Sequence, residues 1–251
     1  MIETRDYVLT IVPNASAMSE RGADIFAEVV SANPGAVVAG PTGSTPLGMF
    51  ERLVAQARAG QLDVSRLRLF CLDEYLGVTA DDPNSLTGWL FRVFIDPAGI
   101  PHANVHTVPA TDPDPIAAAS RYEHDLIAAG GLDLAILGLG PNGHIAFNEP
   151  GSTADSRTRP LNLTEQSVAQ AAAYWKPGVI ALNQAMTLGV ATLLEARRLV
   201  LIVAGEAKAE MLRRTLEDPM SPETPASWLR LAADRLEVVA DAAAAAALTN
   251  R

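Results

Sequence analysis

The stretch AVVAGPTGSTP, residues 36–46, decides the fold. Its first part, residues 36–39, is a short apolar run of the kind that forms a buried strand. The glycines and hydroxyl residues of 40–45 predict a turn, and the spacing of apolar residues over 46–59 predicts a helix. A strand that passes through a glycine-rich turn into a helix is the repeating unit of a parallel α/β sheet.

The same unit recurs along the chain. Further strands are predicted over residues 7–12, 67–72, 105–108, 132–137, 199–203 and 236–239. Helices are predicted over residues 14–32, 86–94, 115–129, 186–194 and 206–216, and the alanine-rich run 241–248 also predicts a helix. This alternation indicates an α/β protein with a single doubly wound, mostly parallel sheet and helices on both faces, of Rossmann-like type. No linker rich in Pro, Gly or Ser divides the sequence, so residues 1–251 are predicted to form one domain.

Composition excludes several classes of partner. The formal net charge of −10 argues against a nucleic-acid-binding surface, although a phosphate needs only a local pocket of amides and one or two cations. Cys71 is the only cysteine, so an internal disulfide is impossible, and its apolar neighbours indicate a buried side chain. No apolar run approaches the roughly 20 residues of a membrane span. We therefore expect a cytoplasmic protein without a membrane segment. The sequence is compatible with a homo-oligomer.

Two segments are candidates for binding a phosphate. In residues 40–46, glycines allow backbone amides to approach an anion, and the following helix start adds free N–H groups. This indicates a cradle formed by Thr42, Gly43, Ser44 and Thr45, although an ordinary helix cap would have a similar sequence. Lys208 follows the strand 199–203 and would supply a cation, unless it is simply a solvated helix lysine.

Two further segments are candidates for acid–base chemistry, and both follow predicted strands. Asp73 ends the strand 67–72, where a carboxylate can take a proton from a carbon beside a carbonyl; a cap or a surface ion pair is the simpler alternative. His144 lies in the glycine-rich loop after strand 132–137, with Glu149 five positions later. A carboxylate near an imidazole fixes its tautomer and raises its basicity. Because ligands bind beyond the carboxyl ends of parallel strands, these segments are expected to converge.

Taken together, these motifs resemble the glucosamine-6-phosphate deaminase/isomerase family, within the 6-phosphogluconolactonase superfamily. The resemblance rests on Pro41-Thr42-Gly43-Ser44-Thr45-Pro46, on Asp73-Glu74-Tyr75 and on Gly143-His144-Ile145-Ala146-Phe147-Asn148-Glu149-Pro150, in the expected order. The stretches 156–159, 187–190 and 205–208 are also similar to the family. The lactonases share the fold and the phosphate loop, and Gly140-Pro141 resembles them, but residues 147–150 have the deaminase form.

The resemblance implies that glucosamine 6-phosphate and water are converted to fructose 6-phosphate and ammonia, without metal or other cofactor. It implies that His144, held by Glu149 and Asn142, assists opening of the sugar ring. It further implies that Asp73 moves a proton between C2 and C1, and that Thr42, Gly43, Ser44, Thr45 and Lys208 hold the phosphate. The expected partner is thus a small sugar phosphate.

The sequence departs from the family pattern at three places. Many deaminases have Asp where Asn142 stands, and an amide cannot serve as a base. The family often places a phosphate-binding Arg after the Ser-Arg-Thr-Arg stretch, whereas residues 163–176 contain no Arg and only Lys176 as a cation. Leu161 stands where allosteric members have a basic residue, so regulation by an acetylated amino sugar phosphate is not predicted.

Three alternatives to a glucosamine 6-phosphate deaminase stay open on the sequence. The galacto epimer differs by one hydroxyl whose contact the sequence does not specify. A 6-phosphogluconolactonase would not need Glu149 and would release no ammonia. A non-catalytic sugar-phosphate sensor would bind the same ligand without turnover, and would suit the missing Arg.

Overall fold

The computed structural model describes residues 7–174 and 183–249. The strands are β1 Val8–Val12, β2 Val37–Gly40, β3 Arg68–Cys71, β4 Asp73–Tyr75, β5 Val105–His106, β6 Leu134–Gly138, β7 Arg159–Asn162, β8 Gln184–Thr187, β9 Leu199–Val203 and β10 Leu236–Asp241. The α-helices are α1 Ala15–Ala32, α2 Leu47–Arg58, α3 Leu86–Leu90, α4 Asp96–Ala98, α5 Pro115–Ala128, α6 Glu165–Tyr174, α7 Val190–Leu194 and α8 Ala209–Glu217. A π-helical turn, η1 Phe91–Ile95, continues α3, and the 3₁₀ helices are η2 His102–Asn104, η3 Glu206–Lys208 and η4 Pro225–Arg235.

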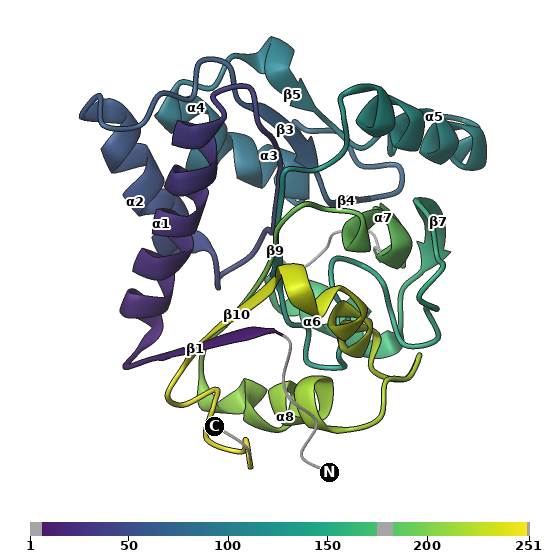
Figure 1. Cartoon of the computed structure of the whole chain (residues 1–251). Coiled ribbons are helices and arrows are strands. Elements are labelled where there is room, and N and C mark those ends of the chain that lie inside the picture. Colours follow the sequence, from purple (N-terminus) through teal and green to yellow (C-terminus); the bar gives the residue numbers. More distant parts are fainter. Residues whose placement is uncertain (1–6, 175–182, 250–251) are drawn as a thin grey trace.

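A seven-stranded sheet in the order β1-β10-β9-β6-β2-β3-β5 forms the centre of the molecule, and every neighbouring pair is parallel. The residues of β2 and β9 are all buried, as expected for strands covered on both faces. Figure 1 shows α1 and α2 on one face of this sheet and α5 and α7 on the other. The predicted doubly wound α/β fold with a parallel sheet is confirmed.

The sheet reverses its winding direction between β2 and β6. From β2 the chain continues outward to β3 and β5, whereas the strands beside β6 are β9, β10 and β1. Val38 of β2 pairs with Leu134 of β6, so the loops that follow these two strands leave from adjacent points of one edge. Such a switch point leaves a crevice between loops and is where ligands bind in open α/β sheets.

A second, three-stranded sheet in the order β4-β8-β7 is antiparallel and was not predicted. Asp73 of β4 pairs with Thr187 of β8, so the predicted helix over 186–194 is wrong in its first part. The helix begins only at Val190, because the backbone of Gly189 is extended, with φ of −74° and ψ of 164°, and forms its N-cap. A Cβ at Gly189 would lie 2.1 Å from the carbonyl oxygen of Ser156.

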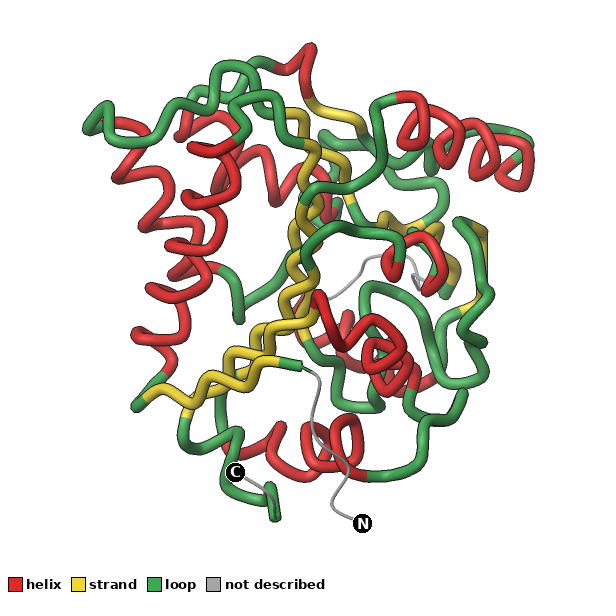
Figure 2. Tube along the Cα trace, in the orientation of Figure 1, coloured by secondary structure: helices red, strands yellow, loops and turns green. Residues whose placement is uncertain are grey.

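The predicted helix over the alanine-rich run 241–248 is also wrong. β10 extends to Asp241, and turns follow it, which Figure 2 shows in green near the C-terminus. The Asp241 carboxylate accepts hydrogen bonds from the backbone N–H groups of Ala244 and Gly205. These side chain–backbone bonds compete with helical ones, so the segment forms turns in which Ala244 and Ala245 are buried and Ala242, Ala243 and Ala246 are exposed.

Within residues 7–174 and 183–249, no helix combines the length and the apolar character that crossing a membrane requires. Among the same residues, no group of three or more His, Cys, Asp or Glu side chains is placed to hold a metal ion.

Candidate active site

The loops after β2 and β6 enclose a cavity of about 440 Å³ at the switch point. Ligand sites for small molecules typically fall in the range of about 300 to 1,000 Å³. Most of the predicted site residues line it: Thr42, Gly43, Ser44, Thr45, Asp73, His144 and Lys208. Asn142 and Glu149 do not line the cavity; they lie behind His144 and contact each other. The structure therefore brings the predicted residues together.

The phosphate loop opens onto the start of α2. Gly43 adopts φ of 98°, a left-handed conformation that favours glycine and turns the chain toward the helix. Pro46 occupies the N-cap position rather than the first helical position, and its own side chain makes no capping hydrogen bond. Free N–H groups at a helix start attract an anion. The loop thus presents hydroxyls and backbone amides to one end of the cavity.

Lys208 faces the same cavity from η3, just beyond β9. Its side chain is half-buried, and burial lowers the pKa of its ammonium below the ordinary value. Among the described residues, the ammonium has no hydrogen-bond or ion-pair partner and is the only Lys or Arg at the cavity wall. A cation without an internal partner beside free amides is suited to an incoming phosphate. Lys176 lies outside the described residues.

Asp73 lies on β4 with its side chain at the cavity wall and only 7% of its surface exposed. Burial, and then the nearby charge of Glu74, raises the pKa of Asp73 to about 8. Glu74 points away from the cavity and anchors α3. Its carboxylate accepts from Ser85 Oγ at 2.6 Å and from the backbone N–H of Thr87 at 2.9 Å. The two neighbouring carboxylates therefore have separate roles.

The imidazole of His144 packs against Gly140 on one side of the cavity. A Cβ at Gly140 would lie 2.4 Å from His144 Nε2, so this position has room only for glycine. Burial lowers the pKa of His144, while the charge of Glu149 opposes that shift and the charge of Lys208 adds to it. The buried ring is therefore biased toward its neutral form, which can both accept and donate a proton.

Glu149 and Asn142 form a buried polar group behind this ring. Asn142 Nδ2 donates to Glu149 Oε2 at 2.7 Å, and Asn142 Oδ1 accepts from the backbone N–H of His144 at 3.2 Å. Glu149 Oε2 lies 3.9 Å from His144 Nδ1, which is too long for a hydrogen bond. Asn142 thus donates to one oxygen of the Glu149 carboxylate and orients the loop that carries His144. Its amide cannot serve as a second acid.

The family-like stretch 156–159 supports the loop rather than reaching the cavity. Arg159 donates to Asn148 Oδ1 at 3.0 Å and to Ser152 Oγ at 2.8 Å. Arg157 pairs with Glu123 and Glu195 near the surface. These guanidinium groups fix the chain that follows His144.

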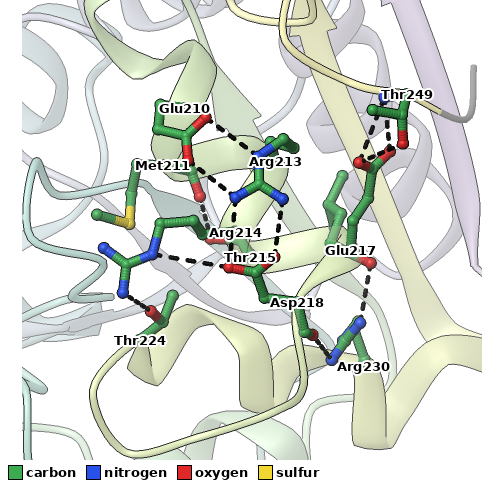
Figure 3. A network of polar contacts seen from close by, with 11 residues as sticks. Glu210, Met211, Arg213, Arg214, Thr215, Glu217, Asp218, Thr224, Arg230 and Thr249 are labelled. Atoms are coloured by element: carbon green, nitrogen blue, oxygen red, sulfur yellow. Dashed lines mark hydrogen bonds and ion pairs between the residues drawn. The ribbon is translucent and has the colours of Figure 1, made fainter.

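A network of charged residues on α8 supports the other side of the same loop (Figure 3). Arg214 Nη2 donates to Thr224 Oγ1 at 3.1 Å, and Arg230 donates to the carbonyl oxygens that end α8. Thr224 packs against Gly143, and the Ala226 N–H donates to the Gly143 carbonyl at 2.8 Å. The loop bearing His144 is therefore held between α8 and the 156–159 stretch.

Comparisons with known proteins agree with this geometry. The family described as glucosamine-6-phosphate isomerases/6-phosphogluconolactonase matches residues 13–238. The chain belongs to this family. A relative from Rhodopirellula baltica named glucosamine-6-phosphate deaminase is 40% identical over 97% of this chain and 96% of its own. One from Streptomyces avermitilis with the same name is 40% identical over 94% of this chain and 91% of its own.

Solved structures lead to the same family. A structure described as a monomeric glucosamine-6-phosphate deaminase superposes with a TM-score of 0.91 at 32% identity, covering 96% of this chain and 99% of that one. A 6-phosphogluconolactonase from Trypanosoma brucei gives a TM-score of 0.77 at 22% identity, covering 98% of this chain and all of that one, and shows the fold alone.

In this member of the glucosamine-6-phosphate isomerase/6-phosphogluconolactonase family, sequence reasoning missed part of the site. Ser167, Gln170 and Ala171 line the cavity from one face of α6. Thr164, just before this helix, bonds to Glu149. The spacing of Thr164 and Ser167 is typical of a helix start and was available in the sequence.

Proposed function

We propose that this enzyme converts glucosamine 6-phosphate and water to fructose 6-phosphate and ammonia. One observation carries the proposal: Asp73 and His144 line one cavity together with the phosphate loop and Lys208, and Glu149 lies directly behind His144. The names of relatives that are 33–40% identical over nearly the whole chain support the same substrate. We also propose that both sheets belong to one catalytic domain, because residues from both line the cavity.

The phosphate would bind at the start of α2. Thr42, Gly43, Ser44 and Thr45 would surround it with hydroxyl and amide groups, and Lys208 would neutralise part of its charge. With one end of the sugar fixed, its reacting carbons would lie farther along the cavity, toward Asp73 and His144. Fixing the substrate in this way holds its reacting carbons beside the catalytic side chains, so that the step becomes effectively unimolecular.

His144 would open the sugar ring. Its neutral imidazole would take the proton from the O1 hydroxyl and return a proton to the ring oxygen O5, so that the C1–O5 bond breaks and an aldehyde forms. Glu149 would stabilise the positive charge that develops on the ring during this transfer. The buried position of the pair strengthens that interaction.

Asp73 would then move one proton. Its carboxylate takes the proton from C2 of the open sugar and returns it to C1, while O1 gains a proton and the amine nitrogen loses one, which together convert the aldehyde and amine to a hydroxyl and a C2 imine. Water adds to the imine, ammonia leaves, and the ketone of fructose 6-phosphate remains. Asp73 must be ionised to begin, and a substrate bound with its amine protonated would favour the ionised carboxylate.

The test is ammonia release from purified protein with glucosamine 6-phosphate. Galactosamine 6-phosphate and 6-phosphogluconolactone are assayed alongside, with the variants Asp73→Asn and Glu149→Gln. Ammonia from glucosamine 6-phosphate that is lost in both variants supports the proposal. Release only from the galacto sugar assigns the other epimer. Lactone hydrolysis without ammonia moves the protein to the lactonases, and binding of all three without turnover indicates a sensor.

Other properties stay predictions. A possible homo-oligomer and a cytoplasmic location are expectations of the sequence, and the similar structure described as monomeric makes a monomer the first hypothesis to test by sedimentation. Leu161 lies on β7 at the position where allosteric relatives are expected to have a basic residue. Addition of N-acetylglucosamine 6-phosphate is therefore expected to leave the rate unchanged.

A further inference from the structure

We propose that the Asp73 carboxylate is the recognition site for the ammonium group of the substrate, so that the cavity selects sugar phosphates with a positively charged amine over their hydroxyl analogues. The inference rests on the proposed function and deepens it, because it names the group that distinguishes an amino sugar from other sugar phosphates. It also gives Asp73 a second role beside proton transfer. The cation that Asp73 recognises keeps the carboxylate ionised for the reaction.

The carboxylate of Asp73 has no partner within residues 7–174 and 183–249. The side chain is only 7% exposed, and no hydrogen bond or ion pair from these residues reaches its oxygens. The neighbouring Glu74 is fully paired, since its carboxylate accepts four hydrogen bonds, two on each oxygen. A buried carboxylate that is ionised and unpaired is strongly unfavourable. Asp73 therefore needs either a proton of its own or a cation that the ligand brings.

The charges of the cavity are separated in a way that fits such a ligand. Among the described residues that line it, Asp73 is the only acid and Lys208 is the only Lys or Arg. Strands β6 and β2 lie between β9, which precedes Lys208, and β3, which precedes Asp73. The two charges therefore approach the phosphate loop from opposite sides, and they form no ion pair with each other. Glucosamine 6-phosphate has the matching arrangement, with its phosphate on C6 and its amine on C2.

The elements packed against Asp73 supply no cation. Strand β8 and helix α3 contact β4, and neither has a titratable side chain. In the described part of the chain, the titratable side chains that act on Asp73 or line its cavity are Glu74 and Tyr75 on its own strand, Cys71 before it, Tyr122 on α5, and His144 and Lys208. Burial, and then the charge of Glu74, raises the pKa of Asp73 to about 8, and a bound ammonium group would lower this pKa again. At neutral pH, binding of the ammonium group is therefore expected to release the proton of Asp73.

The competing explanation is that Asp73 stays protonated and bonds to a sugar hydroxyl. The amine would then be recognised by a neutral group of the wall, such as the amide of Gln170. In that case Asp73 would contribute equally to the binding of an amino sugar and of its hydroxyl analogue, and no proton would leave the protein. Affinity and proton release therefore distinguish the two explanations.

The test uses two ligands that cannot react because their C1 is reduced to an alcohol: 2-amino-2-deoxyglucitol 6-phosphate and glucitol 6-phosphate. They differ only at C2, so the contribution of the phosphate cancels between them. Isothermal titration calorimetry gives both Kd values and, in buffers of different ionisation enthalpy, the number of protons exchanged. At pH 8 the wild type is expected to bind the amino ligand at least about tenfold more tightly, the effect of one hydrogen bond between charged groups. At pH 7 the amino ligand is expected to release about one proton more than the hydroxyl ligand.

Two variants separate the role of Asp73 from the loss of a negative charge in general. In Asp73→Asn the two ligands are expected to bind within about twofold of each other, without the extra proton, because the amide cannot ionise. Binding of glucitol 6-phosphate by this variant shows that its cavity is intact. Asp24→Asn removes one negative charge from the exposed side of α1, away from the cavity, and is expected to keep the full preference for the amino ligand.

Equal affinity of the wild type for both ligands, or a preference that survives in Asp73→Asn, would overturn the recognition role. If Asp73→Asn bound neither ligand, the proton count of the wild type would decide, since absence of the extra proton contradicts the proposal and its presence supports it. Because neither ligand reacts, failure to release ammonia from glucosamine 6-phosphate would refute the proposed function and leave the binding result interpretable.

Discussion

The backbone of Gly140 lies directly against the imidazole of His144, so that a methyl group added at Gly140 would come within 2.3 Å of the ring carbon Cδ2. Gly140 is therefore required because the ring of His144, four positions later, fills the space that a side chain at position 140 would need. Gly140→Ala is expected to displace the ring and lower kcat/KM at least about tenfold, while the sheet and its packing stay intact. Steady-state assays and circular dichroism together test this.

Gly35→Ala is the control for that experiment. The added methyl group at Gly35 meets only an ordinary contact, 3.8 Å from Asn33 Oδ1, and the position lies at the opposite edge of the sheet. It is expected to retain full activity. Equal losses in both variants would mean that backbone stiffening, and not the displacement of His144, lowers the rate.

The second prediction concerns the pH dependence of activity. The pKa of Asp73 is raised to about 8, chiefly by burial, so its carboxyl group is mostly protonated below that pH. Because kcat/KM reports the free enzyme, it is expected to rise with pH through about 8 as Asp73 becomes able to accept a proton. A kcat/KM that is already constant from pH 5 upward would show that Asp73 is ionised much earlier than its burial implies.

The third prediction concerns stability and involves the same residue. Between the ordinary pKa of 3.8 and about 8, the folded protein keeps a proton on Asp73 that the unfolded chain has lost. The contribution of this residue to the free energy of unfolding therefore falls as pH rises, by up to about 1.4 kcal/mol per pH unit.

Asp73→Asn removes this dependence. Relative to the wild type, the variant is expected to gain about 3 kcal/mol in the free energy of unfolding between pH 5 and pH 7, measured by urea denaturation. A difference that stays constant with pH would mean that Asp73 ionises alike in the folded and unfolded chains.

The fourth prediction concerns the phosphate. Lys208 is the only Lys or Arg that lines the cavity within the described residues, so it has no neighbour to compensate for its loss. Lys208→Ala is expected to raise KM about tenfold or more and to weaken competitive inhibition by inorganic phosphate equally. Lys208→Arg keeps the charge and is expected to recover part of the affinity. Unchanged inhibition by phosphate in Lys208→Ala would place the phosphate elsewhere in the cavity.

Much of the fold was predictable from sequence because parallel, buried strands are continuous apolar runs. Residues 199–203 illustrate this, since the strand was predicted with its observed bounds. The antiparallel sheet was missed because its strands are short and carry functional residues: β4 is Asp73–Tyr75 alone. Propensity does not identify strands whose formation depends on a partner more than 100 residues away, as that of Asp73 depends on Thr187.

The candidate site was predictable where residues with catalytic side chains lie in a glycine-rich loop directly after a strand. Glycine loops after strands are recognisable, and His144 with Glu149 lies in such a loop. The place of Ser167 in the site was not predictable, because its spacing from Thr164 indicates only a helix start, and its proximity to His144 comes from tertiary packing. The clamp in which Glu123 of α5 accepts hydrogen bonds from Thr158 and Thr192 has the same origin.

The pairing of β1 with β10 has a consequence for how the protein is made. Val8 lies opposite Glu237, so β1 leaves the ribosome more than 200 residues before β10, its only neighbour in the sheet among the described residues. At a synthesis rate of roughly 5 to 20 residues per second, β1 has no partner strand for at least about ten seconds. During that time its half-exposed apolar residues have no sheet to join. Nascent chains arrested before residue 236 are therefore expected to bind chaperones through their N-terminal segment and to stay sensitive to protease there.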